Sequence, residues 1–193
     1  MELMPKIVNE KPYDGFERKV ARLGLVGLID EVKVLISQFD LLLLEERQKN
    51  SSAAVRRMLD ARFAATPGWR KIQSGGIDWT KCTFHNGAEV CMGVELQVSA
   101  RSDLLTNDLT HLMRAIERGD IDVGVIVVPS NDTAPFLTDR VPRFRDALDH
   151  VDRAKAQFSP LLILSIGHDG PGPALPKMVT NRGEGGRRRS RGA

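Results

Sequence analysis

Two continuous apolar runs, residues 123–128 and 161–166, constrain the fold of this 193-residue chain more than any other feature. A strand with one face in water alternates apolar and polar residues, whereas these runs stay apolar at almost every position. Both faces of each strand are therefore expected to be buried. The sheet that contains them must then be covered by helices on both faces.

Four stretches show the three- and four-residue apolar spacing that favours amphipathic helices. The first covers residues 16–46, and the second begins at Ser51 and Ser52, whose hydroxyls suit a helix N-cap. The others cover residues 104–117, which Gly119 follows as a helix-ending glycine, and about 138–157. Residues 1–13 contain two prolines and are expected to be irregular.

A β meander is predicted between the second and third helices. Its parts are a short strand at 69–73, a strand at 77–84 and a partner strand at 90–98. Asn86-Gly87 suits the positive φ angles of a tight hairpin turn between the two longer strands. The complete order predicts an α/β fold, with a mixed β-sheet flanked by helices.

The length fits one domain, expected over residues 1–170, with N-terminal helices in 16–65 and a sheet core in 66–166. Residues 171–193 are rich in Gly, Pro and Arg and are expected to form a disordered tail. Five arginines against Glu184 give residues 182–193 a charge of +4, which leaves −1 of the total +3 for residues 1–181. The charge of the body therefore does not by itself indicate nucleic-acid binding.

Cys82 and Cys91 are the only cysteines. Because the N-terminus lacks a signal-peptide pattern and no apolar run is long enough to span a bilayer, a cytoplasmic protein without a membrane segment is expected. Its cysteines are then expected to be reduced, small and buried. A disulfide across the hairpin is the alternative.

The strand at 90–98 carries the residues best suited to chemistry. Glu95 and Gln97 are two positions apart, so they project from the same side of the strand, opposite Leu96. The hairpin folds Asp78 back toward Glu95. Two carboxylates placed in this way suit Mg²⁺, whose bound water can attack a phosphorus atom, and the neutral Gln97 can orient that water. An ordinary strand with polar residues would show the same pattern, so the spacing alone does not decide.

More of the chain resembles the BglII-type restriction endonucleases, a branch of the PD-(D/E)xK nuclease superfamily. The resemblance lies in residues 68–69, 76–79, 93–97, 104–109, 121–129 and 159–164. It implies a PD-(D/E)xK core in which Asp78, Glu95 and Gln97 are catalytic. It also implies that Asp78, Glu95 and the Leu96 carbonyl bind Mg²⁺. The Glu-x-Gln motif is typical of this branch. The number of residues between Asp78 and Glu95 is larger than expected for the family, which implies a longer hairpin.

The same resemblance implies a type II restriction endonuclease that acts as a homodimer on a short palindrome in double-stranded DNA, with relatives that read GATC-centred sites. A companion DNA methyltransferase is implied in the host. Two loops are expected to contact DNA because their side chains suit base edges. They contain Ser99, Arg101 and Ser102 after the catalytic strand, and Ser130, Asn131, Asp132 and Thr133 after the strand at 123–128.

Two alternatives use the same fold: a sequence-specific DNA-binding protein without catalysis, and a repair or phage nuclease. Two further points stay open at this stage. Glu45 or Glu46, at the expected end of the first helix, is a possible additional metal ligand. Lys81 is predicted to face away from Asp78 and to contact a phosphate at most.

Overall fold

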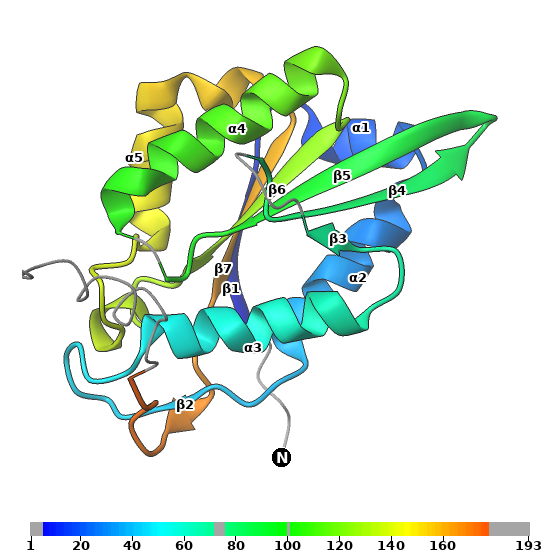
Figure 1. Ribbon diagram of the computed structural model, residues 1–193. Coiled ribbons are helices and arrows are strands. Elements are labelled where there is room, and N and C mark those ends of the chain that lie inside the picture. The colour runs from blue at the N-terminus through cyan, green and yellow to red at the C-terminus, as the bar shows by residue number, and fades with distance from the viewer. Residues whose placement is uncertain (1–5, 72–75, 100, 178–193) are drawn as a thin grey trace, which may run out of the picture.

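A six-stranded mixed sheet forms the centre of the protein (Figure 1), which we describe from a computed structural model covering residues 6–71, 76–99 and 101–177. Strands β5, β6 and β7 pair in parallel, and the remaining neighbours pair antiparallel. In order across the sheet, the strands are β1 (Ile7–Pro12), β7 (Leu161–Ile166), β6 (Val123–Pro129), β5 (Ala88–Leu96), β4 (Trp79–His85) and β3 (Arg70–Lys71). The predicted α/β fold with a mixed, helix-flanked sheet is confirmed.

Helices cover both faces of this sheet (Figure 1). On one face, the core includes side chains from α1 (Phe16–Arg22), α2 (Val26–Ser37) and α3 (Ser52–Ala65). On the other face, the core includes side chains from α4 (Leu105–Arg118) and α5 (Phe144–Ala154). Short 3₁₀ helices lie at Ser102–Leu104, Ala134–Phe136 and Ala156–Phe158.

Strand β6 shows why the apolar runs require two covered faces. Val123, Val125 and Val127 belong to the core under α1–α3, whereas Ile126 and Val128 belong to the core under α4 and α5. Every residue of β6 and of β7 is buried. The absence of polar alternation in these strands was therefore a correct indication of burial on both sides.

The predicted helix ends at Ser51 and Gly119 are also confirmed. The Ser51 hydroxyl accepts a hydrogen bond from the Ala54 amide at 3.3 Å, so it satisfies one of the free donors at the start of α3. Gly119 adopts φ 74° at the end of α4, a left-handed conformation that costs glycine little.

The first helical prediction was too long. Gly24, at φ 65°, separates α1 from α2, and α2 ends at Ser37. Beyond that point the chain extends into β2 (Leu42–Leu43), so Glu45 and Glu46 do not end a long helix. The apolar residues near position 43 follow a helical spacing by coincidence and are buried from an extended segment instead.

The two ends of the described chain are more ordered than expected. Residues 1–13 were predicted to be irregular, but β1 forms an edge strand antiparallel to β7, with Pro12 at its last position. An edge strand tolerates proline because one side of its backbone needs no partner strand.

At the other end, the predicted tail begins too early. Strand β8 (Gly170–Pro171) pairs in parallel with β2, and Leu175 packs against the core under α1–α3. The Ser51 amide donates a hydrogen bond to the Leu175 carbonyl. The arginines from Arg182 onward lie outside the described residues.

The helix predicted near residues 138–157 is shorter than expected because α5 begins only at Phe144. Asp139 and Arg140 have positive φ angles of 67° and 50°, which are incompatible with a right-handed helix. Pro142 follows them and disfavours helical geometry at the residue before it.

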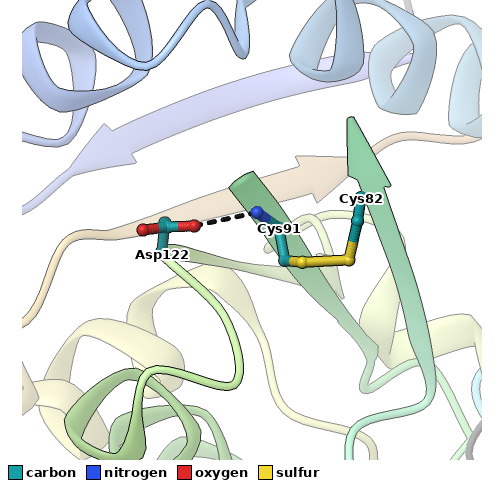
Figure 2. Close-up of a disulfide and its surroundings, with 3 residues drawn as sticks. All are labelled: Cys82, Cys91 and Asp122. Atoms are coloured by element: carbon teal, nitrogen blue, oxygen red, sulfur yellow. Dashed lines mark hydrogen bonds between the residues drawn. A yellow bond between two sulfur atoms is a disulfide. The ribbon is translucent and has the colours of Figure 1, made fainter. Parts of the chain in front are cut away.

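The β4–β5 hairpin extends beyond the rest of the sheet (Figure 1) and turns at Asn86-Gly87, with φ angles of 51° and 80°. The turn prediction is therefore confirmed. Cys82 and Cys91 lie directly opposite each other in this hairpin and form a disulfide (Figure 2). The expectation of reduced, buried cysteines was wrong, because cross-strand pairing brings the two sulfurs together and leaves Cys82 exposed.

The Asp122 carboxylate accepts a hydrogen bond from the Cys91 amide at 2.8 Å (Figure 2), which links the hairpin to the turn before β6. None of the helices in the described ranges has the length and apolar character needed to cross a membrane.

The disulfide is expected to stabilise the hairpin by restricting the unfolded chain. We predict that the Cys82→Ser/Cys91→Ser double variant loses up to about 3 kcal/mol of unfolding free energy, because the bridged loop is short. Chemical denaturation of the oxidised protein and the variant measures this difference. The reduced wild-type protein should match the variant, and equal stability of all three forms would contradict the prediction.

Candidate active site

Asp78 and Glu95 meet where strands β4 and β5 begin to separate. Asp78 lies directly before β4, and its Oδ2 accepts a hydrogen bond from the Leu96 amide at 2.9 Å. This contact ties Asp78 to the strand that carries Glu95. The two carboxyl groups are close enough for the negative charge of Asp78 to raise the pKa of Glu95. The hairpin thus brings the two predicted acids together.

Glu95 occupies an environment that disfavours its charge. The residue is only 4% exposed, and its Oε1 has no hydrogen-bond partner among the described residues. Burial, followed by the negative charges of Asp78 and Asp108, raises the pKa of Glu95 to about 10. A buried carboxylate oxygen without a donor is costly to the fold, and a divalent cation is the kind of partner that would satisfy it. The residues present therefore fit a hard, oxygen-binding metal ion.

Arg56, on α3, contacts Asp78 from the face of the sheet that α1–α3 cover. Its guanidinium donates to Asp78 Oδ1 at 2.6 Å and to the Leu96 carbonyl at 3.0 Å. Asp60, one helical turn further along α3, lies 3.1 Å from Arg56 Nε. Burial alone would lower the pKa of Arg56, but the carboxylates of Asp78 and Asp60 more than offset this effect and raise it. A positive charge thus already contacts two of the three predicted metal ligands.

Asp108 and His111 on α4 complete the cluster on the other face. Ligand atoms of Glu95, Asp108 and His111 all lie within 4.8 Å of one another. Burial, together with the charge of Asp78, raises the pKa of Asp108 to about 7. Sequence reasoning missed Arg56, Asp108 and His111. Each of these residues lies beside the apolar stripe of its helix, and charged or polar residues in that position are too common in proteins to indicate a site.

Gln97 is buried, with 4% of its surface exposed, and its side-chain Nε2 donates to the Arg101 carbonyl at 3.3 Å. Its backbone amide donates to the Val127 carbonyl, which continues the pairing with β6. The amide side chain thus holds the start of the following loop. The predicted role in orienting a water molecule stays a prediction.

The predicted DNA-contacting residues in the loop after β5 differ in their exposure to solvent. Arg101 is exposed and makes two hydrogen bonds, each of 3.0 Å, to the Asp103 carboxylate. Ser99 and Ser102 are half-buried. The Ser102 amide donates to the carbonyl of Arg140, which places this loop beside the segment that precedes α5.

The loop after β6 divides into two pairs of residues. Ser130 and Thr133 are buried and hydrogen-bonded to each other through their hydroxyls at 3.0 Å, so in this conformation they shape the loop from inside. Asn131 and Asp132 are exposed. Of the four residues predicted here, these two are the ones that the loop offers to a DNA molecule.

Other candidates have different partners. Glu45 Oε1 lies 3.3 Å from His168 Nε2 instead of beside Glu95. Lys81 faces away from Asp78 as predicted, but its ammonium donates to both carboxylate oxygens of Glu31 and to the Pro67 carbonyl. These contacts, on the α2 side of the sheet, leave the predicted phosphate contact of Lys81 without support.

A mixed sheet flanked by helices, with two carboxylates converging at the separating ends of a hairpin, is the architecture of a PD-(D/E)xK nuclease. The comparison with protein families agrees with this class. The family described as restriction endonuclease BamHI matches residues 29–187. The chain belongs to this family of restriction endonucleases, which are site-specific deoxyribonucleases that bind DNA and generally use divalent metal ions. No curated protein matches the chain closely enough to be reported as a relative.

The raised pKa of Glu95 leads to a prediction about stability in the presence of a chelator. Because the folded protein holds a proton that the unfolded chain loses above its ordinary pKa of 4.5, stability falls as pH rises from about 4.5 toward about 10. Asp108 contributes in the same direction up to about pH 7. Glu95→Gln, which resembles the protonated acid, should therefore raise the unfolding free energy at pH 8 by about 1 kcal/mol or more.

Denaturant titrations at pH 5 and pH 8 in EDTA measure this effect. Glu117→Gln, at an exposed position of α4, is the matched control and should leave the pH dependence unchanged. A Glu95→Gln variant that is as pH-dependent as the wild-type protein would contradict the prediction.

Proposed function

We propose that this protein is a type II restriction endonuclease that hydrolyses phosphodiester bonds in a short palindromic site of double-stranded DNA, with Mg²⁺ as its metal. The observation that carries the proposal is the convergence of Asp78 and Glu95, held by the hydrogen bond between the Leu96 amide and Asp78 Oδ2. Membership in the BamHI family supports the reaction class. The Glu-x-Gln motif at 95–97 favours the BglII-type branch.

In this proposal, Asp78, Glu95 and the Leu96 carbonyl hold the metal ion. When bound, such an ion lowers the pKa of a water molecule and offsets the negative charge that develops on the phosphate. Gln97 then orients the attacking water through its side-chain amide. This role requires the Gln97 amide to give up, or to share, its present hydrogen bond to Arg101.

Arg56 adds a step before catalysis. It now contacts Asp78 and the Leu96 carbonyl, so these atoms become ligands only when its guanidinium moves away or rotates. Until then, Arg56 compensates the charge of Asp78. We infer that the guanidinium and the metal ion compete for this edge of the sheet.

The proposed DNA contacts come from the two loops that flank the carboxyl ends of β5 and β6. Arg101, Asn131 and Asp132 are exposed and suit base edges. Ser102 borders a surface pocket that is also lined by Arg47, Arg140 and Arg143. Three arginines in one pocket are suited to phosphate groups, which contribute most of the affinity of DNA-binding proteins.

Several finer features follow from the BglII-type assignment and are proposed with it. The enzyme acts as a homodimer, since a palindrome presents two equivalent half-sites. Its site is GATC-centred, and a companion methyltransferase protects the host DNA. We further propose that it acts in the cytoplasm and that residues 1–170 form a single nuclease domain, to which β8 and Leu175 add contacts from the next residues.

Removal of the Arg56 guanidinium tests the proposed competition with the metal. Arg56→Met keeps the apolar stem but leaves Asp78 without its cation. It should therefore lose about 1–3 kcal/mol of unfolding free energy in EDTA. Mg²⁺ should then stabilise Arg56→Met more than it stabilises the wild-type protein, because no side chain has to be displaced.

Thermal denaturation with and without Mg²⁺ measures the two effects. Arg57→Met, on the exposed face of the same helix, is the matched control. An equal Mg²⁺-dependent shift in the wild-type protein and in Arg56→Met would remove the support for competition.

The nuclease proposal is tested by incubating the purified protein with plasmid DNA and Mg²⁺, with and without EDTA. Discrete fragments that disappear in EDTA are expected. Asp78→Ala should reduce cleavage by at least about a thousandfold, because loss of a metal ligand removes the charge stabilisation of the transition state. Asp30→Ala, an exposed carboxylate on α2, should cleave as the wild type does.

Three results would overturn parts of the proposal. A shift of specific DNA on a gel without cleavage would favour the non-catalytic binding protein. Degradation without discrete ends would favour a repair or phage nuclease. Full cleavage by Asp78→Ala would remove Asp78 from the active site. Sequencing the ends of discrete fragments identifies the recognition site.

A further inference from the structure

A second group of potential ligands lies on the α4 side of the site. Glu95 comes from β5, and Asp108 and His111 come from α4, three positions apart and therefore on one face of the helix. One ligand atom from each residue lies within 4.8 Å of the others. Two carboxylates and an imidazole at this spacing form an incomplete coordination shell for a divalent cation.

The Glu95 side chain indicates that this group lacks a partner. Its Oε1 is fully enclosed and accepts no hydrogen bond within the described parts of the chain. Native proteins rarely leave a buried carboxylate oxygen in this state, because the lost hydration is not replaced. Asp108, half-buried on α4, places a second carboxylate at the same point.

The positive charge of Arg56 acts on Glu95 and Asp108, but the hydrogen bonds of its guanidinium go elsewhere. Arg56 donates to Asp78 and to the Leu96 carbonyl, and Asp78 Oδ2 is already engaged by the Leu96 amide. Both oxygens of Asp78 therefore have donors, whereas Glu95 Oε1 has none in the described structure. The carboxylate oxygen that lacks a donor therefore belongs to Glu95, on the α4 side of β5.

Solvent has a route to this group through His111. The imidazole is half-buried and lines a surface pocket together with Thr80, Arg114 and Arg118, and the Arg118 guanidinium is paired with the Asp120 carboxylate in the same pocket. His111 is the member of the group that lines this pocket, and its ligand atom lies within 4.8 Å of those of Glu95 and Asp108. This pocket also leaves space for the water ligands that would complete an octahedral shell.

We propose that Glu95, Asp108 and His111 form a second cation site, on the α4 side of β5, that shares Glu95 with the proposed nuclease centre. The inference rests on the proposed function only for the identity of the first ion. Because imidazole is a ligand for borderline transition metals, this site selects Mn²⁺ or Zn²⁺ over Mg²⁺. The ion would supply the missing partner of Glu95 Oε1.

Mn²⁺ binding to the full-length protein tests the proposal, by calorimetric titration and by the loss of the free-ion electron paramagnetic resonance signal. The wild-type chain should bind about two ions. Asp108→Asn and His111→Gln should each lose about one ion or bind it at least about tenfold more weakly, and they should keep the other ion. Glu117→Gln, an exposed carboxylate on the same helix, should bind as the wild type does.

The two proposals fail in distinguishable ways. Asp78→Asn should lose the nuclease ion and keep the ion bound by Asp108 and His111. If the wild-type protein binds two ions but cleaves no DNA, the nuclease proposal fails and the second site stands. If Asp108→Asn and His111→Gln bind Mn²⁺ with wild-type stoichiometry and affinity, the second site is overturned while the nuclease proposal stands.

A spectroscopic measurement on the wild-type protein does not depend on whether the variants fold. Pulsed electron paramagnetic resonance of the Mn²⁺-loaded protein should show coupling to a directly bound imidazole nitrogen. Mg²⁺ added in excess should displace the other ion first and leave this coupling in place. Absence of nitrogen coupling at saturating Mn²⁺ would overturn the proposal.

Discussion

The hydrogen bond from the Leu96 amide to Asp78 Oδ2 is the contact on which the site depends. Strand β5 is fixed on one side by parallel pairing with β6 and on the other by the hairpin with β4. Directly before β4 begins, Asp78 continues the contact with β5 through this hydrogen bond. The same strand alternation that buries Leu96 against α1–α3 turns Glu95 toward α4, so one backbone geometry positions both an acid and the core.

Charge balance then links stability to function. Asp78 has a cationic partner in Arg56, whereas the pKa values of the buried Glu95 and the half-buried Asp108 are raised. The apoprotein therefore carries an electrostatic cost at the same place where a cation is expected to bind. Catalytic sites commonly retain such unfavourable groups because a substrate or metal relieves the cost when it binds.

A structural feature of this protein could be predicted from the sequence when it depends only on residues close together in the chain. The apolar runs of β6 and β7, the Ser51 cap and the Asn86-Gly87 turn were predictable, because each depends on a few neighbouring residues. Strand β1 was not predictable, because its polar residues and Pro12 favour irregular structure when the segment is considered alone. Its hydrogen-bond partners come from β7, which is distant in the sequence. The Cys82–Cys91 disulfide likewise depended on the register of the hairpin, which places the two residues opposite each other.

The sequence by itself determined the fold class and the pairing of Asp78 with Glu95, because strand periodicity and a tight turn are local properties. Only the tertiary structure decided which other residues join them. Arg56 arrives from α3 and His111 from α4, from opposite faces of the sheet, and nothing in the spacing of either helix relates it to Glu95. Their proximity follows from helix packing on the sheet, which depends on the shape of the whole core and not on any short segment.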